Sequence, residues 1–335
     1  MQVNSMSNFN QKIIEQFTSF EVKRPNESKS KIQIFADFIE LICMFSKDYV
    51  SKSDIIDRLI DSGEDFSVSL PVDGETGLID SQKHDKAEGW ADSIFEYIEE
   101  RKTIYKSYYP FEIEREIGIK LIEPSTLTEV QKLYLYLLIA SSLNSFKKLQ
   151  HEITKEFESL SEIVLKSYLP ENSKVYGFGS NTKYTGNAQS KIIQLSKDIN
   201  VDIDMRIISQ IPTQSSKEEG LDIISWLPFE DNNPNTIIIF GQCACGKDWF
   251  GKQIDTYRYN RFYKHYLQPF THAMFFPHDF RNKDGRFGFD IDLFDNNLVF
   301  ERRRFLNLAN EDIFEHLNYS KQIIDKCLEY SEDLV

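Results

Sequence analysis

Two apolar stretches of this chain carry polar side chains at positions where strands are expected to begin and end. Asp222 opens the apolar run that reaches Trp226, and Gln242 stands where the run that begins at Thr236 stops. A carboxylate in a buried strand is destabilising unless a partner compensates its charge. A metal ion is one such partner, and phosphodiester hydrolysis is a reaction that it supports. We therefore expect Asp222 and Gln242 to bind one Mg²⁺. The alternative is an aspartate that accepts hydrogen bonds from loop amides.

The neighbouring charged residues complete the predicted catalytic set. One carboxylate and one amide hold Mg²⁺ weakly, so a second acid is expected, and Glu218 or Glu219 precedes the first strand. We assign Glu219 as the further metal ligand, with a solvated loop as the alternative. Lys247, just past the second strand, would stabilise charge on the phosphate or else lie exposed in a loop. Asp248 is expected to act as the N-cap of a following helix.

The sequence around these residues resembles the PD-(D/E)XK, or restriction-endonuclease-like, superfamily. In that superfamily one strand supplies an Asp, and the next supplies Glu or Gln, one further residue and then Lys, before a helix. Asp222 matches the Asp and Gln242 matches the Glu or Gln position, whereas Ala244 stands at the position of the Lys. Because some members place the lysine on the following helix, the resemblance offers Lys247 or Lys252 in its stead.

A second resemblance covers roughly residues 170–310. The order Tyr176-Gly-Phe-Gly-Ser180, a helical stretch at 189–197, Gly-Leu-Asp222 and Gly-Gln-Cys243 is similar to a group of bacterial nuclease-like proteins associated with phage-defence gene clusters. The resemblance implies a Mg²⁺-dependent DNA endonuclease subunit, with Mn²⁺ as the alternative ion. Its expected partners are DNA and a protein such as an ATPase or a sensor subunit. The alternative, motivated by Ala244 and by a glutamine at the acidic position, is a nuclease-fold subunit without catalysis.

Bulk properties define the class of protein. The chain has 335 residues, of which 41% are hydrophobic, including 26 Phe and 16 Tyr. This size predicts two folded domains. The absence of an apolar run of about 18 residues and of a basic, then apolar, N-terminal leader predicts a cytoplasmic protein. The net charge of −14 disfavours unspecific binding to nucleic acid, although Lys and Arg outnumber Asp and Glu between Lys247 and Arg304.

The expected fold class is α/β, with a mainly helical and acidic interaction domain at 1–168 and a mixed sheet flanked by helices, the nuclease domain, at 169–335. Pro170 marks the change of pattern. Helices are predicted at 31–46, 54–61, 86–105, from the expected N-cap Thr126 to about 146, and at 150–168, 187–198, 251–266 and 310–330. A loop is predicted at 62–82. Strands are predicted at 175–178, around 201–206 and at 272–277, and 230–235 is predicted to turn between the two strands of a hairpin.

For the other polar groups, a structural role is weighed against a functional one. Cys243 and Cys245 are spaced C-x-C without a second pair, so we expect reduced strand thiols rather than a zinc site. Lys191 is expected on a solvated helix face, with a phosphate contact as the alternative. The triplet Arg302 to Arg304 is expected either to contact phosphate or to lie in an edge strand. Three scattered histidines, His265, His272 and His278, are not expected to form a metal triad.

Overall fold

The computed structural model describes residues 2–25, 32–46, 48–61, 76–114, 117–179, 183–214, 220–231, 233–246, 249–282, 284–287, 296–310 and 312–330. The fold is mixed α/β with a five-stranded mixed sheet. The chain divides into two compact units, the first formed by Met1–Leu149, His278–Gly288 and Lys321–Val335, and the second by Gln150–Pro277 and Phe289–Ser320. These units are defined by compactness, whereas the boundary expected between residues 168 and 169 separates domains that fold on their own. That boundary stays a prediction. The helix at 150–168 lies in the second unit.

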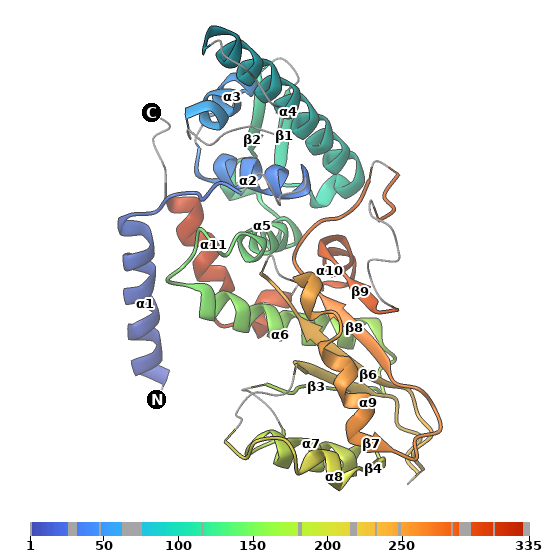
Figure 1. Ribbon diagram of the computed structural model, residues 1–335. Helices are drawn as coiled ribbons and strands as arrows, with labels where there is room; N and C mark the ends of the chain where they lie inside the picture. Colours follow the sequence, from blue (N-terminus) through green and yellow to red (C-terminus); the bar gives the residue numbers. More distant parts are fainter. Residues whose placement is uncertain are drawn as a thin grey trace. The chain divides into compact units, whose positions relative to one another are not determined.

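The first unit is mainly helical (Figure 1). Its elements are α1 (Gln2–Thr18), α2 (Ile32–Phe45), α3 (Lys52–Asp61), α4 (Thr76–Tyr105), β1 (Phe111–Glu114), β2 (Gly118–Leu121), α5 (Glu129–Ser141) and, except for its first residue, α11 (Ser320–Glu329). Every residue of α5 from Leu133 to Ala140 is buried. A helix that is apolar on all sides must be surrounded by other elements, so α5 is central to this unit, as the sequence predicts.

Three boundaries in this unit differ from the predictions. The N-cap of α5 is Thr128 rather than Thr126, and it forms a capping box with Gln131. Thr126 instead ends a short 3₁₀ turn, Pro124–Thr126, because Pro124 fixes the backbone there. The helix stops at Ser141, earlier than expected. The predicted loop at 62–82 is already helical from Thr76, and its residues 62–75 lie outside the described residues.

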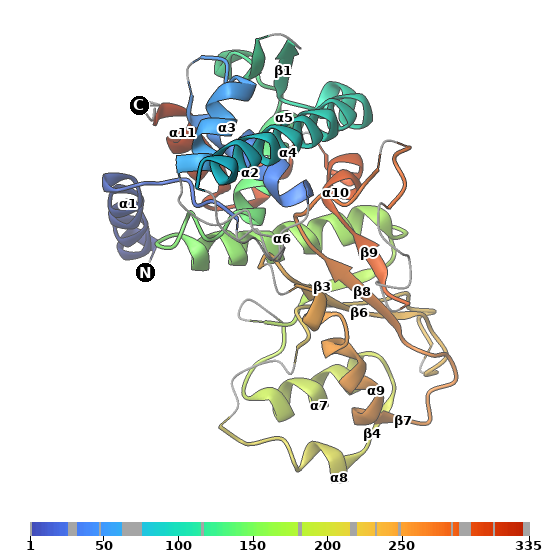
Figure 2. The same cartoon turned by 45° about the horizontal axis from the view of Figure 1, so that its top comes forward.

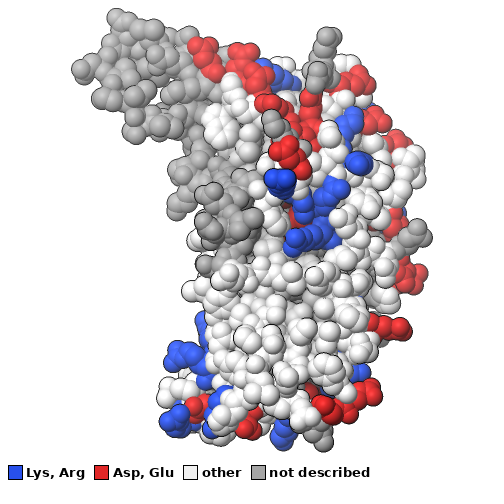
Figure 3. All heavy atoms as spheres, turned by 90° about the vertical axis from the view of Figure 1, so that its right-hand side faces the viewer, with Lys and Arg blue, Asp and Glu red and all other residues white. Residues whose placement is uncertain are grey.

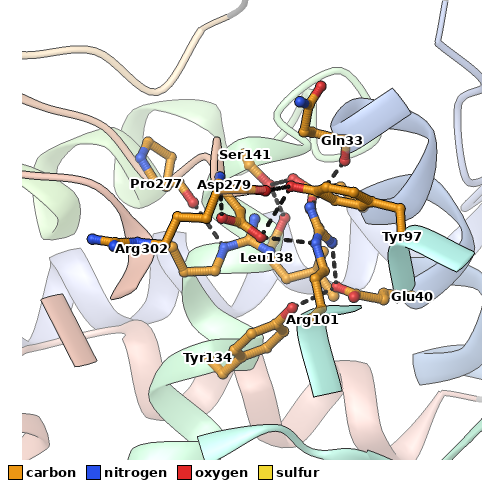
Figure 4. A network of polar contacts seen from close by, with 12 residues as sticks. Gln33, Glu40, Tyr97, Arg101, Tyr134, Leu138, Ser141, Pro277, Asp279 and Arg302 are labelled. Atoms are coloured by element: carbon orange, nitrogen blue, oxygen red, sulfur yellow. Dashed lines mark hydrogen bonds and ion pairs between the residues drawn. The ribbon is translucent and has the colours of Figure 1, made fainter. Parts of the chain in front are cut away.

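A buried polar network joins separate stretches of the first unit (Figure 4). The guanidinium group of Arg101 on α4 is fully buried and forms ion pairs with Asp37 at 2.8 Å, Glu40 at 2.9 Å and Asp279 at 3.0 Å. The carboxylates also accept hydrogen bonds from the hydroxyl groups of Tyr97, Tyr109, Tyr134 and Ser141. Buried charges are tolerated only when they are paired and hydrogen-bonded, so this network holds the 278–288 segment in the unit.

The second unit contains the five-stranded sheet. Its elements are α6 (Gln150–Tyr168), β3 (Lys174–Gly177), α7 (Ala188–Asp198), β4 (Asp202–Ile203), α8 (Met205–Ile208), β5 (Ile223–Trp226), β6 (Ile238–Cys243), α9 (Tyr259–Phe262), β7 (Tyr263–Lys264), β8 (Thr271–Phe275), β9 (Leu298–Phe300) and α10 (Arg302–Leu308). The strand order is β3-β5-β6-β8-β9. The pairs β3–β5 and β5–β6 are antiparallel, whereas β6–β8 and β8–β9 are parallel. The predicted hairpin is therefore confirmed.

Helices cover both faces of this sheet (Figures 1 and 2). On one face α6 packs on β3, β5 and β6 and against α10. On the other face one apolar cluster joins α7 and α9 to the sheet, including Ile192, Leu195, Ile224, Phe240 and Tyr259. Side chains alternate between faces along a strand, so Gln242, two residues after Phe240, belongs to the face covered by α7.

One predicted helix of the second unit is wrong. The predicted helix at 251–266 is a series of 3₁₀ turns, Trp249–Lys252 and Asp255–Arg258, followed by the short helix α9 and strand β7. Its buried residues recur every third position, at Gln253, Thr256, Tyr259 and Phe262. That spacing matches a 3₁₀ helix rather than an α-helix.

The basic triplet also differs from the edge-strand prediction. Strand β9 ends at Phe300, and Glu301 is the N-cap of α10, accepting hydrogen bonds from the backbone N–H groups of Arg303 and Arg304. Arg302 is fully buried and donates from Nε to the carbonyl of Pro277 at 2.9 Å. Arg302 is therefore a structural residue of the second unit.

Candidate functional site

The predicted residues Asp222 and Gln242 meet at one end of the sheet. Asp222 directly precedes β5 and Gln242 lies in β6, the antiparallel neighbour of β5. The backbone N–H of Asp222 donates to the carbonyl of Gly241 at 2.9 Å, and the Asp222 carbonyl accepts from the N–H of Phe178 at 2.6 Å. Backbone hydrogen bonds on both sides thus fix the position of Asp222 across β3, β5 and β6.

A glycine directs the chain into this position. Gly220 has a φ of +80°, a left-handed conformation that favours glycine. A Cβ atom at this position would also lie 2.7 Å from Cβ of Asp255. The glycine of Gly-Leu-Asp is therefore required by both backbone conformation and packing.

Two donors among the described residues contact the Asp222 carboxylate. Its Oδ2 atom accepts from Nε2 of Gln242 at 2.6 Å and from the backbone N–H of Cys243 at 2.7 Å. Asp222 therefore accepts a backbone amide and also directly contacts Gln242, and metal binding by this pair stays a prediction.

Gln242 has one unsatisfied polar atom. Gln242 is 6% exposed. Its Nε2 atom donates to Asp222 and also to the backbone carbonyl of Cys243 at 3.2 Å. Its Oε1 atom is buried and has no hydrogen-bond partner among the described residues. An orphaned buried oxygen is costly in a folded protein, and it often marks a place where a ligand, ion or water binds.

Glu158 on α6 is an acid at this sheet end that the sequence analysis did not single out. A Cβ atom at Gly179, just after β3, would lie 3.8 Å from Oε2 of Glu158. Burial, followed by the charges of Asp222 and Glu158, raises the pKa of the Cys243 thiol well above its usual value. Glu158 and Asp222 thus lie within electrostatic range of the same thiol. No sequence signal distinguishes Glu158 from the other acids of α6, because only tertiary packing brings it here.

The two cysteines of the C-x-C pair are buried thiols. Burial, together with the charge of Glu158, raises the pKa of Cys245, and the charge of Lys252 opposes this shift. All four cysteines of the chain carry free thiols. A raised pKa favours the protonated thiol over the reactive thiolate, and both side chains are buried.

The position of the superfamily lysine holds a buried alanine. Ala244 is 2% exposed, and its N–H donates to the carbonyl of Phe275 at 2.9 Å. Lys252 ends the first 3₁₀ turn after β6, is exposed, and acts on Cys245 through its charge. The predicted residues Lys247 and Glu219, and also Glu218 and Asp248, lie outside the described residues.

Lys191 differs from its expected place on a solvated helix face. It is 7% exposed on α7, and its ammonium group donates to the carbonyl of Gly179 at 3.0 Å and contacts that of Phe178 at 3.5 Å. Phe178 in turn bonds to Asp222. A lysine from one helix layer and Glu158 from the other therefore both reach the segment that follows β3.

His265, His272 and His278 occupy three different environments. His265 is exposed and contacts Asp202 at 3.2 Å. His272 is buried on β8 with Nδ1 2.9 Å from the Thr256 hydroxyl, and burial lowers its pKa to about 4. His278 is buried in the first unit. Among the residues that the structure describes, no group of three or more His, Cys, Asp or Glu side chains forms a metal centre.

The basic stretch from Lys247 to Arg304 is divided between the two units. Its 278–288 part belongs to the first unit, and in the second unit Arg302 is buried while Arg258 pairs with Asp255 at 3.2 Å. On the face drawn in Figure 3, the described Lys and Arg side chains gather in small groups separated by uncharged surface. No helix within the described part of the chain has the length and apolar character needed to cross a bilayer.

Comparisons of this chain with protein-family models, with curated proteins and with solved structures find no match.

Proposed function

We propose that this chain is a metal-dependent DNA endonuclease subunit of a bacterial antiviral defence complex. The observation that carries the proposal is the direct contact of Asp222 and Gln242 at the ends of neighbouring strands, with Oε1 of Gln242 buried and unbonded among the described residues. These are the two residues that match the PD-(D/E)XK pattern. The proposal of a defence role rests on the sequence resemblance alone.

The order of the elements supports the proposal. The resemblance implies a strand with an Asp, then a strand with Glu or Gln, and then a helix. In this chain β5 follows Asp222, β6 contains Gln242, and 3₁₀ turns with the short helix α9 come next. The two strands are antiparallel neighbours, so their side chains can serve one site.

The residues at this sheet end fit Mg²⁺ or Mn²⁺. Mg²⁺ prefers oxygen ligands, and proteins usually hold it through one or two carboxylates together with water and substrate phosphate. Asp222 offers a carboxylate, and Gln242 offers an amide oxygen that has no other partner among the described residues. Glu158 is an acid within electrostatic range of Cys243, and Glu219 is the acid predicted from the sequence. When bound, the ion would polarise the phosphate and lower the pKa of a water molecule.

Each residue then has a defined role. Asp222 would hold the ion, while its backbone bonds to Gly241 and Phe178 keep its carboxylate in place. Gln242 would turn its amide so that Oε1, instead of Nε2, faces the ion.

The test is an Asp222→Asn variant, which keeps the shape of the side chain and removes its charge. We expect cleavage of DNA with Mg²⁺ or Mn²⁺ to fall at least about 100-fold, because the main metal ligand is lost. Asp202→Asn, which changes an exposed acid of the same unit, is the matched control. Wild-type cleavage by folded Asp222→Asn protein would refute the assigned site.

The second candidate function is a nuclease-fold subunit that binds but does not cut. Two observations favour it: Ala244 stands at the position of the superfamily lysine, and Gln242 replaces an acid and donates to Asp222. Absence of cleavage by the wild-type chain, alone and with its partner, under both metal ions would select this alternative.

A protein partner is part of the proposal because of charge. A chain with a net charge of −14 is repelled by DNA except at local basic groups. Affinity that depends on a few phosphate contacts falls steeply with salt. We therefore expect the lone chain to cut poorly at physiological salt in the cleavage assay above, and a partner that supplies DNA contacts to raise the rate. Vigorous cutting by the lone chain would exclude such licensing.

A further inference from the structure

We propose that Phe250 inserts between base pairs of the bound DNA beside Asp222 and Gln242, and that Ile254 contacts the same groove. The inference rests on the proposed function and adds an apolar contact with the substrate. Its first support is exposure, because Phe250 is 53% exposed and Ile254 is 58% exposed. Single apolar side chains are normal on a protein surface, whereas two large ones on one short segment indicate a binding surface.

The segment 249–255, which carries both side chains, begins at the end of the sheet that holds the site. Trp249 is buried and packs on Phe276, which directly follows β8, with ring centroids 5.0 Å apart. Strand β8 is the parallel neighbour of β6, and its residue Met274 lies opposite Gln242. Phe276 and Trp249 are therefore at the same end of the sheet as Gln242.

The other end of the segment lies against the turn that leads to Asp222. A Cβ atom at Gly220 would lie 2.7 Å from Cβ of Asp255, and Gly220 precedes Asp222 by two residues. The charges of Lys252 and Asp222 also both act on the thiol of Cys245, which follows β6. The segment therefore passes beside the proposed metal site.

The residues between the two apolar side chains favour nucleic acid as the occupant. Lys252 lies between Phe250 and Ile254, is exposed, and forms no ion pair with a described residue. A Cβ atom at Gly251 would meet no described atom within 4 Å, so a DNA backbone can come close there. An apolar wedge beside a cation is typical of proteins that bind the minor groove. A protein partner usually covers about 800 Å², which two side chains on one short segment do not offer.

A wedge at this place has a mechanical use. Insertion of an apolar side chain unstacks one base step and kinks the duplex, so the phosphates beside the kink are presented to the site. The ring of Phe250 packs edge-on against that of Trp249, with centroids 5.8 Å apart. Its position is therefore restricted before DNA binds, and less conformational entropy is lost on binding.

The experiment compares Phe250→Ala with Phe229→Ala in the full-length chain. Phe229 is 74% exposed and follows β5 at the opposite end of the sheet, so it is a matched exposed ring away from the site. Binding of a short DNA duplex is measured without divalent metal, from low salt upward. We expect Phe250→Ala to weaken binding about 5-fold to 150-fold, the effect of losing one contact between an aromatic ring and a base. Phe229→Ala should bind as the wild type does.

The salt dependence separates an apolar contact from an ionic one. Phe250→Ala should leave the slope of log affinity against log salt unchanged, because no charge is lost. Lys252→Met should lower the slope by about 0.9, the value for one phosphate contact. A smaller slope in Phe250→Ala would show that the change displaces cations, and would overturn the wedge.

A fluorescent base reports insertion directly. Duplexes that carry 2-aminopurine at successive positions become more fluorescent where this base is unstacked. We expect the wild type and Phe250→Leu, which keeps an apolar wedge, to raise the fluorescence, and Phe250→Ala to abolish the rise. Circular dichroism and thermal unfolding check that each variant is folded, as the exposure of Phe250 predicts.

The outcomes distinguish this inference from the proposed function. Wild-type affinity and fluorescence in Phe250→Ala, in a chain that cleaves DNA, would overturn the inference and leave the nuclease proposal intact. A fluorescence rise that depends on Phe250, in a wild-type chain that never cleaves, would support the wedge and reject the nuclease proposal. Loss of self-association in Phe250→Ala at unchanged DNA affinity would assign the segment to a second copy of the chain. That result, or a wild-type chain that binds no DNA at any salt concentration, would overturn the inference.

Discussion

In the proposed function, the chemistry of the site depends on the amide group of Gln242. In the metal-free protein its Nε2 atom neutralises part of the charge of Asp222, and its Oε1 atom is buried without a hydrogen bond among the described residues. Metal binding would reverse this orientation, because a cation between the two side chains needs an oxygen from each. A glutamine at this position therefore serves the metal-free state better than a glutamate does.

A Gln242→Glu variant tests this reasoning. The change removes the donor to Asp222 and places a second carboxylate against it, so we expect the metal-free protein to lose about 2–3 kcal/mol of stability. Two carboxylates bind Mg²⁺ more tightly than one, so added Mg²⁺ should raise the unfolding temperature more than it does in the wild type. Thermal unfolding with and without Mg²⁺ measures both effects. Gln210→Glu, an exposed change in the same unit, is the control. Equal Mg²⁺ responses in wild type and variant would show that this pair does not bind the ion.

At the scale of elements, α6 packs on one face of the sheet and is tied directly to its first strand. Glu162 on α6 accepts a hydrogen bond from the N–H of Gly177 in β3 at 3.0 Å. Burial raises the pKa of Glu162, although this hydrogen bond opposes the shift. A carboxyl group whose pKa is higher in the folded state than in the unfolded state stabilises the fold at low pH. That contribution is lost as pH rises through the folded-state value.

We therefore expect Glu162→Gln to be more stable than the wild type at neutral pH. The amide oxygen still accepts from Gly177, and no charge is buried. The difference between variant and wild type should shrink as pH falls toward 4.5, the ordinary pKa of the side chain, because the wild-type carboxyl is then protonated. Urea unfolding at pH 4.5 and pH 7 measures this difference. A variant that is less stable at pH 7 would show that the charged form makes a stabilising contact.

The elements also show how far the sequence predicts this structure. The helix predicted at 150–168 is confirmed with these bounds, because its amphipathic pattern is strong and Pro170 follows it. The contact between Asp222 and Gln242 was predictable because a hairpin joins their strands. The positions of Glu158 and Lys191 were not predictable, because each is brought to the sheet end by packing of a helix that is distant in sequence. The prediction of a helix at 251–266 is wrong, because the buried residues of this stretch repeat every three positions, the spacing of a 3₁₀ helix.

At the scale of the whole molecule, the chain passes between the two units more than once. The segment His278–Gly288 follows β8 of the second unit, yet Asp279 pairs with Arg101 in the first. Removing Arg101 leaves three carboxylates without their buried counter-charge. Such a loss typically costs about 3–5 kcal/mol, a large part of the stability of a folded domain. A separate C-terminal fragment would therefore lose this anchor of the 278–288 segment.

The packing of α6 decides where the chain can be shortened to leave a folded C-terminal fragment. A fragment that begins at residue 169, the predicted boundary, lacks this helix. The sheet then loses Phe157, which stacks on Phe305 with ring centroids 5.2 Å apart, and the fully buried side chains of Leu160 and Val164. It also loses Glu156, whose carboxylate accepts backbone N–H groups of Tyr319 and Ser320.

We expect residues 150–335 to unfold cooperatively and residues 169–335 to be unfolded or aggregated. Each large apolar side chain of α6 contributes about 1.5–3 kcal/mol by its burial, so the loss of several exceeds the usual stability margin of a domain. The 150–335 fragment should still melt below the full chain, because Asp279 has lost Arg101. Far-ultraviolet circular dichroism and thermal unfolding of the three proteins measure this order. Cooperative melting of both fragments at the same temperature would show that α6 does not belong to the fold that carries the site, and would restore the boundary at 168 and 169.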